Sequence, residues 1–305
     1  MRIGTVIPHL GAGASPAGIV RAAQRSEELG YDSLWVAERV LYPVDPQTPY
    51  PGTTGGPLPD VYRRVFSPIE TLTWAAAHTK TIALGTSVLV MPYHNPVLVA
   101  RQLTTLDVLS GGRLRVGLGQ GWSKDELDAT GAPARGRDAR ADEFIAVLLA
   151  MWGDDPVEFE GEFFRVPRSI IQPKPIQQPR PPLYLAAYTP GALGRMARLA
   201  DGWLPTGVPL AGVGQMMGQA RQMAQAAGRD GAALELIVLA HCMLADRPQG
   251  PGRGEFAGSL EEIREDVEAA RGLGASEIIL SAGFSPLAQS EEGFLQALEQ
   301  LRHLA

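Results

Sequence analysis

One unit recurs along this chain, a helical segment that ends on Leu-Gly or Asp-Gly and is followed by a short apolar run. It is visible in EELGYDSLWVAE, RLADGWLPT and ARGLGASEIILSAG. Glycine can take the left-handed conformation that ends a helix, and the Val, Ile, Leu and Trp residues that follow are typical of a strand buried on both faces. Because strands that alternate with helices form parallel sheets, the unit predicts an α/β fold.

Over the whole chain, expected strands and helices alternate through eight rounds, which limits the possible architectures. Strands are expected near residues 2–7, 33–37, 82–90, 113–118, 183–187, 202–205, 234–241 and 276–281. Helices are expected near residues 16–29, 68–79, 96–109, 138–152, 190–200, 210–227, 259–272 and 290–303. Eight such units in 305 residues predict a (β/α)8 TIM barrel that forms a single domain over residues 1–305. The active site of such a barrel lies where the C-terminal ends of the strands meet the following loops.

Two segments are longer than the connections that a barrel needs, and we interpret both as insertions. Residues 40–66, after strand 2, are rich in Pro, Gly and aromatic residues. Residues 153–182, between helix 4 and strand 5, contain the alternating run VEFEGEFFRVP and then QPKPIQQPRPP. The first insertion leaves the functional face of the barrel, so it is either a lid over the substrate or a rigid surface loop.

Composition limits the classes of partner and compartment. The net charge of −6 comes without a long run of either sign, which argues against nucleic acid or a membrane surface as a partner and favours a small-molecule substrate. Cys242 is the single cysteine, so a disulfide within the chain is excluded. The first residues lack a signal-peptide pattern, and the apolar run at 82–91 is too short to span a bilayer. A cytoplasmic protein is expected.

Helix starts can also be located in the sequence. Ser67 precedes Pro68 and a glutamate three residues after the serine, Ser259 and Glu262 form a capping-box pattern, and Asn95 precedes a proline. The segment LGTSVLVMPYHNPVLVARQL therefore marks a junction between a strand and a helix. Whether Asn95 only caps the helix or also borders a site stays open.

The glycines of RLRVGLGQGWSKDEL lie at the end of the fourth strand. Gly117, Gly119 and Gly121 allow backbone N–H groups to approach a ligand closely, as a phosphate or the edge of a flavin requires. Trp122 stands where a dinucleotide-binding fingerprint would place glycine, so that fingerprint is rejected. The alternative is that these glycines serve only the tight exit from the barrel.

A second candidate for anion binding follows the fifth strand in LAAYTPGALGRMARLADG. Thr189 can cap the next helix, Pro190 can begin it, and Gly191 leaves its N-terminal amides open, with Arg195 one turn further on. The same pattern is also compatible with capping alone.

Five histidines occur, and they differ in their expected positions. His78 and His303 are placed in or after helices. His9 and His241 lie near the C-terminal ends of strands, where they either face the pocket or are satisfied core residues, and we favour the second interpretation. His94, beyond the third strand, is better placed as a proton carrier or polar contact. No HxH or HExxH spacing occurs, so no metal site is expected. The chain also lacks the G-x-S-x-G elbow of serine hydrolases.

Four segments together carry a family resemblance. GYDSLWVAERVLYP, LGTSVLVMPYHNPVLVARQLTTLDVLSGGRLRVGLGQGWSKDEL, MWGDDPVEFEGEFFRV and DGWLP occur in this order. The chain resembles the bacterial luciferase-like monooxygenase superfamily, and within it the coenzyme F420 (deazaflavin) dependent oxidoreductases of actinobacterial type. The resemblance runs nearly from end to end and implies a TIM-like barrel with an insertion. It also implies hydride transfer to or from C5 of the deazaflavin.

The resemblance implies positions for the cofactor. In related enzymes the third strand ends in a bulge, often with a non-proline cis peptide, that backs the central ring of the flavin. Here the bulge would fall at Ser87-Val88, with His94 and Asn95 near the rim of the cofactor. The loops after strands four and five would line the cofactor and its phosphate side through Gly119, Gln120, Gly121, Ala187, Tyr188 and Thr189. Gly191 is added to the predicted cofactor site from the helix start described above.

One departure from the family pattern concerns the catalytic groups. The deazaflavin-dependent sugar-phosphate and alcohol dehydrogenases of this superfamily show Asp-His after the second strand, where this chain has Glu38-Arg39. Their histidine-centred acid–base step therefore cannot be transferred directly, and a different substrate is expected. The predicted catalytic residues are Glu38 and Arg39, which orient the substrate or the ring, and His94, which contributes a hydrogen bond or a proton.

Two rival functions stay open at this point. An FMN-dependent monooxygenase would use the same fold with oxygen and a separate cofactor reductase. A non-catalytic relative would hold a flavin weakly or act as a structural partner. Because members of the superfamily often dimerise through the barrel helices, a homodimer is the expected assembly.

Overall fold

Eight parallel strand positions close into a barrel in the computed structural model, which describes residues 1–52, 57–133 and 135–304. Closure is complete because β3 pairs with β2 on one side and with β5 on the other. The predicted TIM barrel is therefore confirmed. In order around the barrel the strands are β1 (Arg2–Val6), β2 (Ser33–Val36), β3 (Ala83–Thr86) with β4 (Leu89–Val90), β5 (Leu114–Gly119), β8 (Leu183–Leu185), β9 (Gly202–Trp203), β10 (Glu235–His241) and β13 (Glu277–Ser281).

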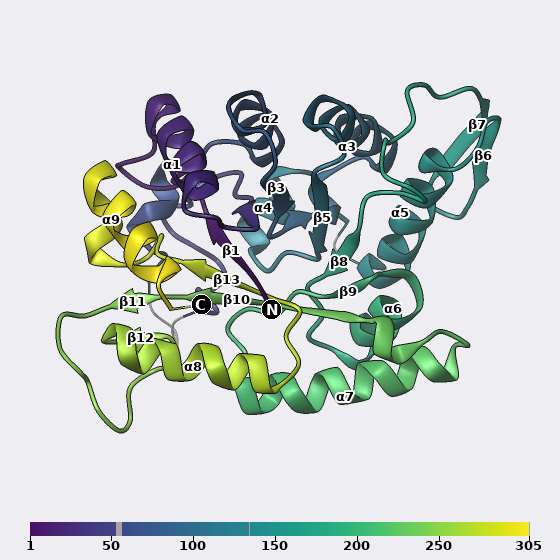
Figure 1. Ribbon diagram of the computed structural model, residues 1–305. Helices are drawn as coiled ribbons and strands as arrows, with labels where there is room; N and C mark the ends of the chain where they lie inside the picture. Colours follow the sequence, from purple (N-terminus) through teal and green to yellow (C-terminus); the bar gives the residue numbers. More distant parts are fainter. Residues whose placement is uncertain (53–56, 134, 305) are drawn as a thin grey trace.

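Helices surround the strands on all sides (Figure 1). The outer ring consists of α1 (Pro16–Glu28), α2 (Pro68–His78), α3 (Pro96–Ser110), α5 (Arg137–Trp152), α6 (Pro190–Leu199), α7 (Leu210–Ala226), α8 (Leu260–Gly272) and α9 (Glu291–Arg302). Shorter helical elements are α4 (Lys124–Ala129), η1 (Asp60–Arg63), η2 (Met91–Tyr93), η3 (Gly231–Ala233) and η4 (Pro286–Gln289). Within the described part of the chain, no helix combines the length and the apolar character needed to cross a bilayer.

The caps predicted from the sequence were correct at three helices and wrong at one. Asn95 accepts hydrogen bonds from the Val97 and Leu98 amides, Thr189 caps α6, and Ser259 forms the full capping box. Ser67 makes no side-chain cap at α2 within residues 57–133; its carbonyl accepts a hydrogen bond from the hydroxyl of Thr71.

The third barrel position is interrupted, whereas the sequence predicted one strand over residues 82–90. The break between β3 and β4 contains the cis peptide Ser87–Val88, where the resemblance had placed it. Pairing with β5 resumes out of step across the break. Gly85 pairs with Arg115 and Leu89 with Leu118, so four steps along the third position match three along β5. The extra residue is a β-bulge, which turns the chain toward the end of the barrel.

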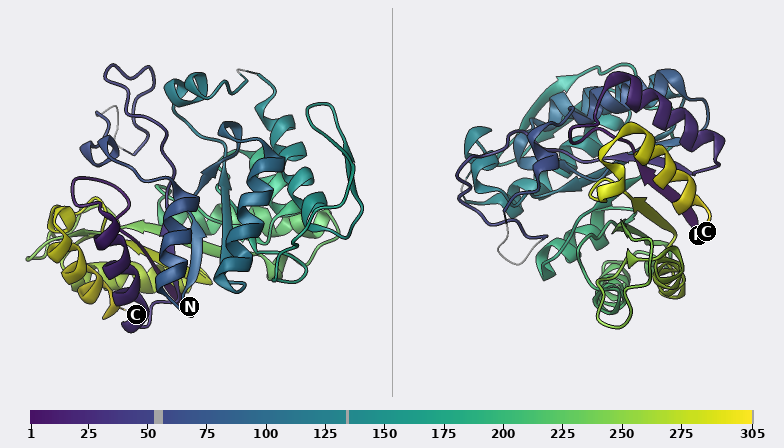
Figure 2. Two further views of the ribbon diagram at one scale, coloured as in Figure 1. Left: turned by 90° about the horizontal axis from the view of Figure 1, so that it is seen from above. Right: turned by 90° about the vertical axis from the view of Figure 1, so that its left-hand side faces the viewer.

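Both predicted insertions are present. Residues 153–182 contain the antiparallel hairpin of β6 (Val157–Glu160) and β7 (Arg165–Ser169), which projects outward from the barrel in Figure 1. The loop between β2 and α2 projects together with α4 at one end of the barrel (Figure 2, left). A further insertion, not predicted, follows β10 and contains the short pair β11 (Met243–Leu244) and β12 (Ala257–Gly258).

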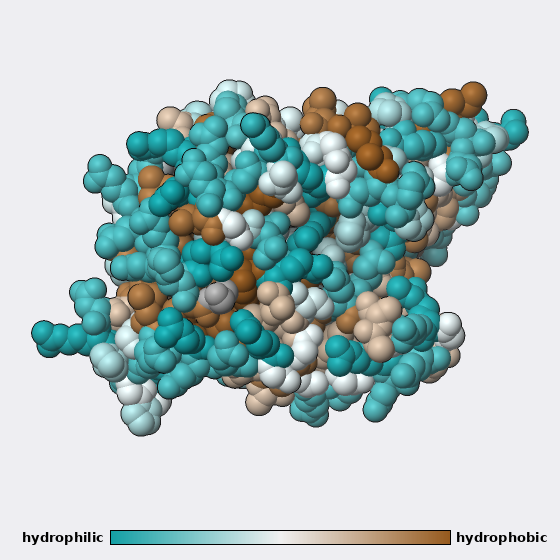
Figure 3. All heavy atoms as spheres, in the orientation of Figure 1, coloured by the Kyte–Doolittle hydropathy of each residue, from teal (hydrophilic) through white to brown (hydrophobic). Residues whose placement is uncertain are grey.

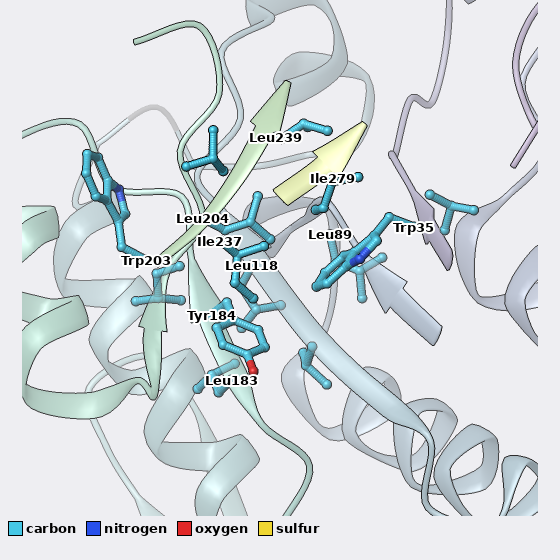
Figure 4. Packing of buried hydrophobic residues seen from close by; sticks show 14 of the residues in the cluster. Trp35, Leu89, Leu118, Leu183, Tyr184, Trp203, Leu204, Ile237, Leu239 and Ile279 are labelled. Carbon is cyan, nitrogen blue, oxygen red and sulfur yellow. The ribbon is translucent and has the colours of Figure 1, made fainter. Parts of the chain in front are cut away.

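Large aromatic residues fill the middle of the barrel (Figure 4). Trp35 and Tyr184 are fully buried and meet edge to face at 6.4 Å between ring centroids. Glycine on the neighbouring strands makes room for the indole. A Cβ at Gly85 would lie 2.3 Å from the Trp35 ring, and one at Gly4 would lie 2.9 Å from its Nε1. These two glycines are thus explained by packing around the tryptophan.

The N-terminal end of the barrel is closed by a buried ionic group around Glu277. This carboxylate, which has no exposed surface, pairs with Arg2 at 3.1 Å and with Arg115. It also accepts hydrogen bonds from the hydroxyl of Ser33 and, at 3.0 Å, from the indole N–H of Trp35. A buried carboxylate needs such partners to offset the loss of hydration. Polar contacts thus form the floor of the barrel.

Candidate functional site

A cavity of about 650 Å³ opens at the C-terminal ends of the strands. Its lining comes from segments far apart in the sequence, from Val6 and Ile7 at the end of β1 to Gly283 and Phe284 after β13. Leu204 and Leu239, which also line it, belong to the packed interior shown in Figure 4. The volume lies within the range of about 300–1,000 Å³ that is typical of small-molecule sites.

Glu38 brings a carboxylate to the cavity wall. Its side chain is only 7% exposed and accepts hydrogen bonds from the Val90 amide at 2.6 Å and from Nε2 of His94 at 2.9 Å. His94 contacts Glu38 from the side away from the cavity, because, among the described residues, Glu38 and Tyr93 line the cavity and His94 does not. The sequence placed Glu38 and His94 at different strand ends, and the structure joins them into one pair.

Arg39 is held between two aromatic rings at the same wall. Its guanidinium carbon is 4.9 Å from the centroid of Tyr62 and 4.7 Å from that of Trp122. Nη2 lies 3.1 Å from Oε2 of Glu126, and the side chains of Arg39 and Glu126 are 6% and 1% exposed. Arg39 and Glu126 therefore form an ion pair without a hydrogen bond of good geometry, because Nε and Nη2 of Arg39 have no suitable acceptor among the described residues.

Glu126 is the residue that ties the β2–α2 loop to α4. Besides the contact with Arg39, it accepts hydrogen bonds from the amides of Val40 at 2.6 Å and Leu41 at 3.2 Å, and from the hydroxyl of Tyr93 at 3.1 Å. Burial and this carboxylate together raise the pKa of Tyr93 well above its usual value. Sequence reasoning missed Glu126. A serine followed three residues later by glutamate, here Ser123 and Glu126, is a pattern that predicts the start of a helix, and α4 does begin there. The Glu126 side chain, however, binds the β2–α2 loop.

A series of edge-to-face ring contacts lines the cavity, and we call it the aromatic wall. It runs from His241 to Phe284, Tyr62, Tyr50 and Trp122, with centroid separations of 4.8, 5.8, 5.8 and 5.6 Å. The hydroxyl groups of Tyr50 and Tyr62 also share a hydrogen bond of 3.2 Å. Burial raises the pKa of Tyr62 far above its usual value, so its hydroxyl stays protonated. No periodic sequence pattern predicts these rings, because they come from separate segments: the loop after β2, the loop after β5, the end of β10 and the loop after β13.

The bulge and the glycine loop form a second part of the lining. Ser87 and Val88 line the cavity together with Gly119 and Gly121. A Cβ at Gly119 would lie 2.5 Å from Cγ2 of Val88, and Gly121 has φ +69° with its Cβ position 2.6 Å from Val90. Packing against the bulge and backbone conformation therefore already require these glycines. Their role in ligand binding stays a prediction.

Polar groups gather where α5 and α6 begin. Arg137, Asp138, Gln120 and Thr189 line the cavity there, and the Gln120 amide donates to Asp138 at 3.0 Å. Oε1 of Gln120 is buried without a hydrogen-bond partner in the described chain. Arg195, suggested above as an anion ligand, instead pairs with Asp138 at 3.0 Å and with a second carboxylate of α5, so its guanidinium is already engaged.

The two histidines near strand ends differ from each other. His9 is satisfied, as predicted, because Nδ1 lies 2.9 Å from the Ile7 carbonyl and Nε2 accepts from the Ala37 amide at 2.9 Å. His241 lines the cavity, and its Nδ1 is enclosed without a partner among the residues that the structure describes. The interpretation of His241 as a satisfied core residue was therefore wrong. Desolvation lowers the pKa of both side chains to about 4.

The predicted site residues divide into two groups by position. Those that line the cavity are Glu38, Arg39, Ser87, Val88, Gly119, Gln120, Gly121, Tyr188 and Thr189. Those outside the described lining are His94, Asn95, Ala187 and Gly191. Asn95 is occupied in capping α3, and Ala187 is buried with its carbonyl accepting from the Trp203 indole. Ala186 takes the cavity position instead, since successive residues of an extended segment point to opposite sides.

Comparison with solved structures shows the same fold in known enzymes. A monooxygenase, RslO1, from Streptomyces bottropensis superposes with a TM-score of 0.81 at 23% identity, covering 99% of this chain and 98% of that one. An F420-dependent secondary alcohol dehydrogenase superposes with a TM-score of 0.78 at 18% identity, covering 100% and 98%. At these identities the likeness concerns the fold alone.

Comparison of sequences identifies the family. An uncharacterized protein of Mycobacterium tuberculosis is 36% identical over 207 residues, or 68% of this chain and 72% of that protein. An FMNH2-dependent dimethylsulfone monooxygenase of Pseudomonas putida is 31% identical, covering 69% and 56%. An F420-dependent glucose-6-phosphate dehydrogenase of Kineococcus radiotolerans is 30% identical, covering 63% and 53%. The profile of the family described as luciferase-like monooxygenase matches residues 1–250. The chain therefore belongs to the luciferase-like monooxygenase family.

Proposed function

We propose that this chain is an oxidoreductase that transfers a hydride between coenzyme F420 and a small organic substrate. The observation that carries the proposal is the Glu38–His94 pair, in which the carboxylate faces the cavity and the imidazole supports it from behind at 2.9 Å. When bound, the deazaflavin supplies or accepts the hydride at its C5. A proton must leave or reach the substrate as the hydride moves, and a carboxylate within hydrogen-bond reach can exchange it.

The described residues fit a tricyclic ring of this kind. The cavity has the volume of a ligand site, and the bulge at Ser87–Val88 gives it a backbone wall beside Gly119 and Gly121. The enclosed Oε1 of Gln120 lacks a donor in the described chain, which suits an N–H at the pyrimidine edge of the ring. We assign these five residues to the ring of the cofactor.

We assign the phosphate side of the cofactor to the loop before α6. Tyr188 and Thr189 line the cavity there, and Arg137 adds a positive charge from the start of α5. The N-terminus of α6 supplies free amides and the favourable end of the helix dipole. In this arrangement Ala187 and Gly191 contribute through the backbone of that loop, and Asn95 fixes the start of α3.

Arg39 and His94 have supporting roles in the proposal. Arg39 is fixed by two rings and by Glu126, so it orients the substrate or the ring rather than moving a proton. His94 acts through Glu38, because it binds that carboxylate and does not itself belong to the described cavity lining. In this proposal the acid–base pair comes from the ends of two strands, with Glu38 after β2 and His94 beyond β4.

A second candidate function is that of an FMN-dependent monooxygenase supplied by a separate cofactor reductase. The sequence similarity supports this candidate as well. The chain is 31% identical to the FMNH2-dependent dimethylsulfone monooxygenase and 30% identical to the F420-dependent glucose-6-phosphate dehydrogenase. A third candidate, a non-catalytic relative, is distinguished by its failure to bind either cofactor.

The test is a titration of the purified chain with F420 and with FMN, followed by fluorescence. Tighter binding of F420 supports the proposal, tighter binding of FMN supports the monooxygenase, and the absence of binding at micromolar concentration supports the non-catalytic relative. Alcohols and carbonyl compounds are then screened for a change in F420 absorbance.

Two variants test the proton pair once a substrate has been found. The Glu38→Gln variant should bind F420 as the wild type does and lose about 100-fold or more in turnover, the usual worth of a general acid–base group. The control is Glu158→Gln, which removes an exposed carboxylate from the outer hairpin. Unchanged turnover in His94→Ala would remove His94 from the mechanism.

We further propose a homodimer formed through α2 and α3. Trp74, Leu98 and Leu109 on these helices are 47%, 65% and 64% exposed, and an apolar patch lies over α3 in Figure 3. Contiguous apolar surface of this kind marks association sites. Sedimentation of the wild type and of Leu98→Lys tests this, with a dimer expected only for the first. The single cysteine, buried and free, is compatible with the cytoplasm that we propose as the compartment.

A further inference from the structure

We propose that the aromatic wall binds the substrate, and that this substrate is a planar, uncharged, conjugated carbonyl compound whose oxygen accepts a hydrogen bond from His241. The inference rests on the proposed function, since the compound would occupy the cavity beside a flavin-type cofactor. It names the substrate class, which the fold and the Glu38–His94 pair leave open.

The shape of the wall favours a flat apolar body. Five rings succeed one another in edge-to-face contact, and all five belong to residues of the cavity lining. Each of these contacts orients a ring relative to its neighbour, so the wall is set before a ligand arrives. Aromatic ligands gain both buried area and favourable ring geometry from such a surface. A flexible polar ligand such as a sugar would gain less from it.

His241 supplies a hydrogen-bond donor at the end of this wall. Its Nδ1 is enclosed without a partner in the described chain, and its ring packs at 88° against Phe284. An enclosed N–H without an acceptor is rarer than an enclosed lone pair, so we assign the proton to Nε2. Nε2 is then the nitrogen that can reach the cavity, and it donates. A side chain whose pKa is about 4 is neutral at pH 7, which makes it a donor without charge.

The charges around the wall favour an uncharged ligand. The guanidinium of Arg39 is already matched by Glu126 at 3.1 Å, and both side chains are buried. Glu38 adds a second carboxylate to the same lining, with the His94 imidazole and the Val90 amide as its partners. A carboxylate ligand would therefore meet Glu38 without a free cation from the described wall to balance it, and it would lose its hydration on entry.

The experiment measures binding of three probes of similar shape to the protein saturated with its cofactor. The probes are 2-acetylnaphthalene, 2-naphthoate and 2-ethylnaphthalene, and affinity is measured by isothermal titration. We expect the ketone to bind more tightly than the carboxylate and the hydrocarbon.

The variant is His241→Phe, which keeps a ring against Phe284 and removes the donor. It should lower the ratio of ketone affinity to hydrocarbon affinity by about two- to tenfold, the worth of one hydrogen bond. Use of the ratio cancels general effects of the substitution on the cavity. The control is His303→Phe, at an exposed position after α9, which should leave the ratio unchanged.

Three results would overturn the inference. The first is that the carboxylate binds as tightly as the ketone. The second is that the affinity ratio is unchanged in His241→Phe. The third is that bound cofactor excludes all three probes, which would assign the aromatic wall to the cofactor. Failure of the proposed function is seen separately, as the absence of cofactor binding in the same preparation. In that case the titration is run on the protein alone, and the ratio in His241→Phe again decides.

Discussion

Removal of the negative charge of Glu126 should destabilise the protein far more than removal of a charge two residues away. Glu126 is buried and contacts Arg39, two backbone amides and a tyrosine hydroxyl. Asp128, on the same helix, is exposed and pairs with Lys124 across one helical turn. The variants Glu126→Gln and Asp128→Asn therefore make the same chemical change in two environments.

The expected magnitudes follow from burial. Loss of one partner of a buried ion pair costs about 3–5 kcal/mol in free energy of unfolding. Since glutamine keeps one carbonyl oxygen for the Val40 and Leu41 amides, we expect about 3 kcal/mol for Glu126→Gln. An exposed pair is worth about 0–1 kcal/mol, which bounds the loss for Asp128→Asn. At about 2 °C per kcal/mol for a chain of this size, Tm should fall by about 6 °C in the first variant and by no more than about 2 °C in the second.

The assay is thermal unfolding followed by circular dichroism, with limited proteolysis as a second readout. The loop of residues 40–66 should become more sensitive to protease in Glu126→Gln, because Glu126 holds the amides at its start. The double variant Arg39→Met with Glu126→Gln removes both charges, so it should recover about 2 kcal/mol relative to Glu126→Gln alone. If Glu126→Gln costs no more than Asp128→Asn, the ion pair does not hold this region together, and the account of Arg39 given above is wrong.

Three further predictions concern other parts of the molecule. Burial lowers the pKa of His9 and of His241 to about 4, whereas both titrate near 6.5 in the unfolded chain, so the unfolded state takes up these two protons first as the pH falls. Their contribution to stability should be fully present above about pH 6.5 and fall by at most about 1.4 kcal/mol per pH unit for each histidine down to about pH 4; a Tm that stays flat from pH 6.5 to 5 would contradict this. Gly85→Ala should destabilise the barrel by about 1–3 kcal/mol in urea unfolding, since its Cβ would lie 2.3 Å from the Trp35 ring, whereas Gly218→Ala, on α7 with open space around it, should cost nothing. Arg137→Glu should weaken the binding of a phosphate-bearing cofactor about tenfold, with a loss that shrinks at high salt, while the same change at Arg165 on the outer hairpin should have no effect; equal affinities would place the phosphate elsewhere.

The sequence was sufficient for the barrel because each strand–helix unit carries its own local signals. The apolar run of β2, the glycine before it and the caps at Asn95, Thr189 and Ser259 all act over a few residues. Such signals can be read without knowledge of the rest of the fold. The break between β3 and β4 has no such signal in its apolar pattern, and only the family resemblance placed the bulge at Ser87-Val88.

The site could be predicted only in part, because its contacts join distant segments. Glu38 and His94 were each singled out, yet nothing in the spacing of 56 residues between them indicates that they share a hydrogen bond. Glu126 was missed for the same reason, since Val40 and Leu41, whose amides it binds, lie more than 80 residues earlier, in the loop after β2. His241 was misjudged because a histidine at a strand end has the same sequence pattern whether or not its ring finds partners.

The ionic floor around Glu277 has a consequence for the order of events in the cavity. Arg2 and Arg115 bind that carboxylate beneath the packed Trp35, so the described residues close the N-terminal end of the barrel, and ligands should reach the cavity from the C-terminal ends of the strands. If cofactor and substrate lie one above the other in this closed-ended cavity, they should enter in sequence. The one seated deeper arrives first and departs last, so the steady-state kinetics of a two-ligand reaction here should follow an ordered rather than a random scheme.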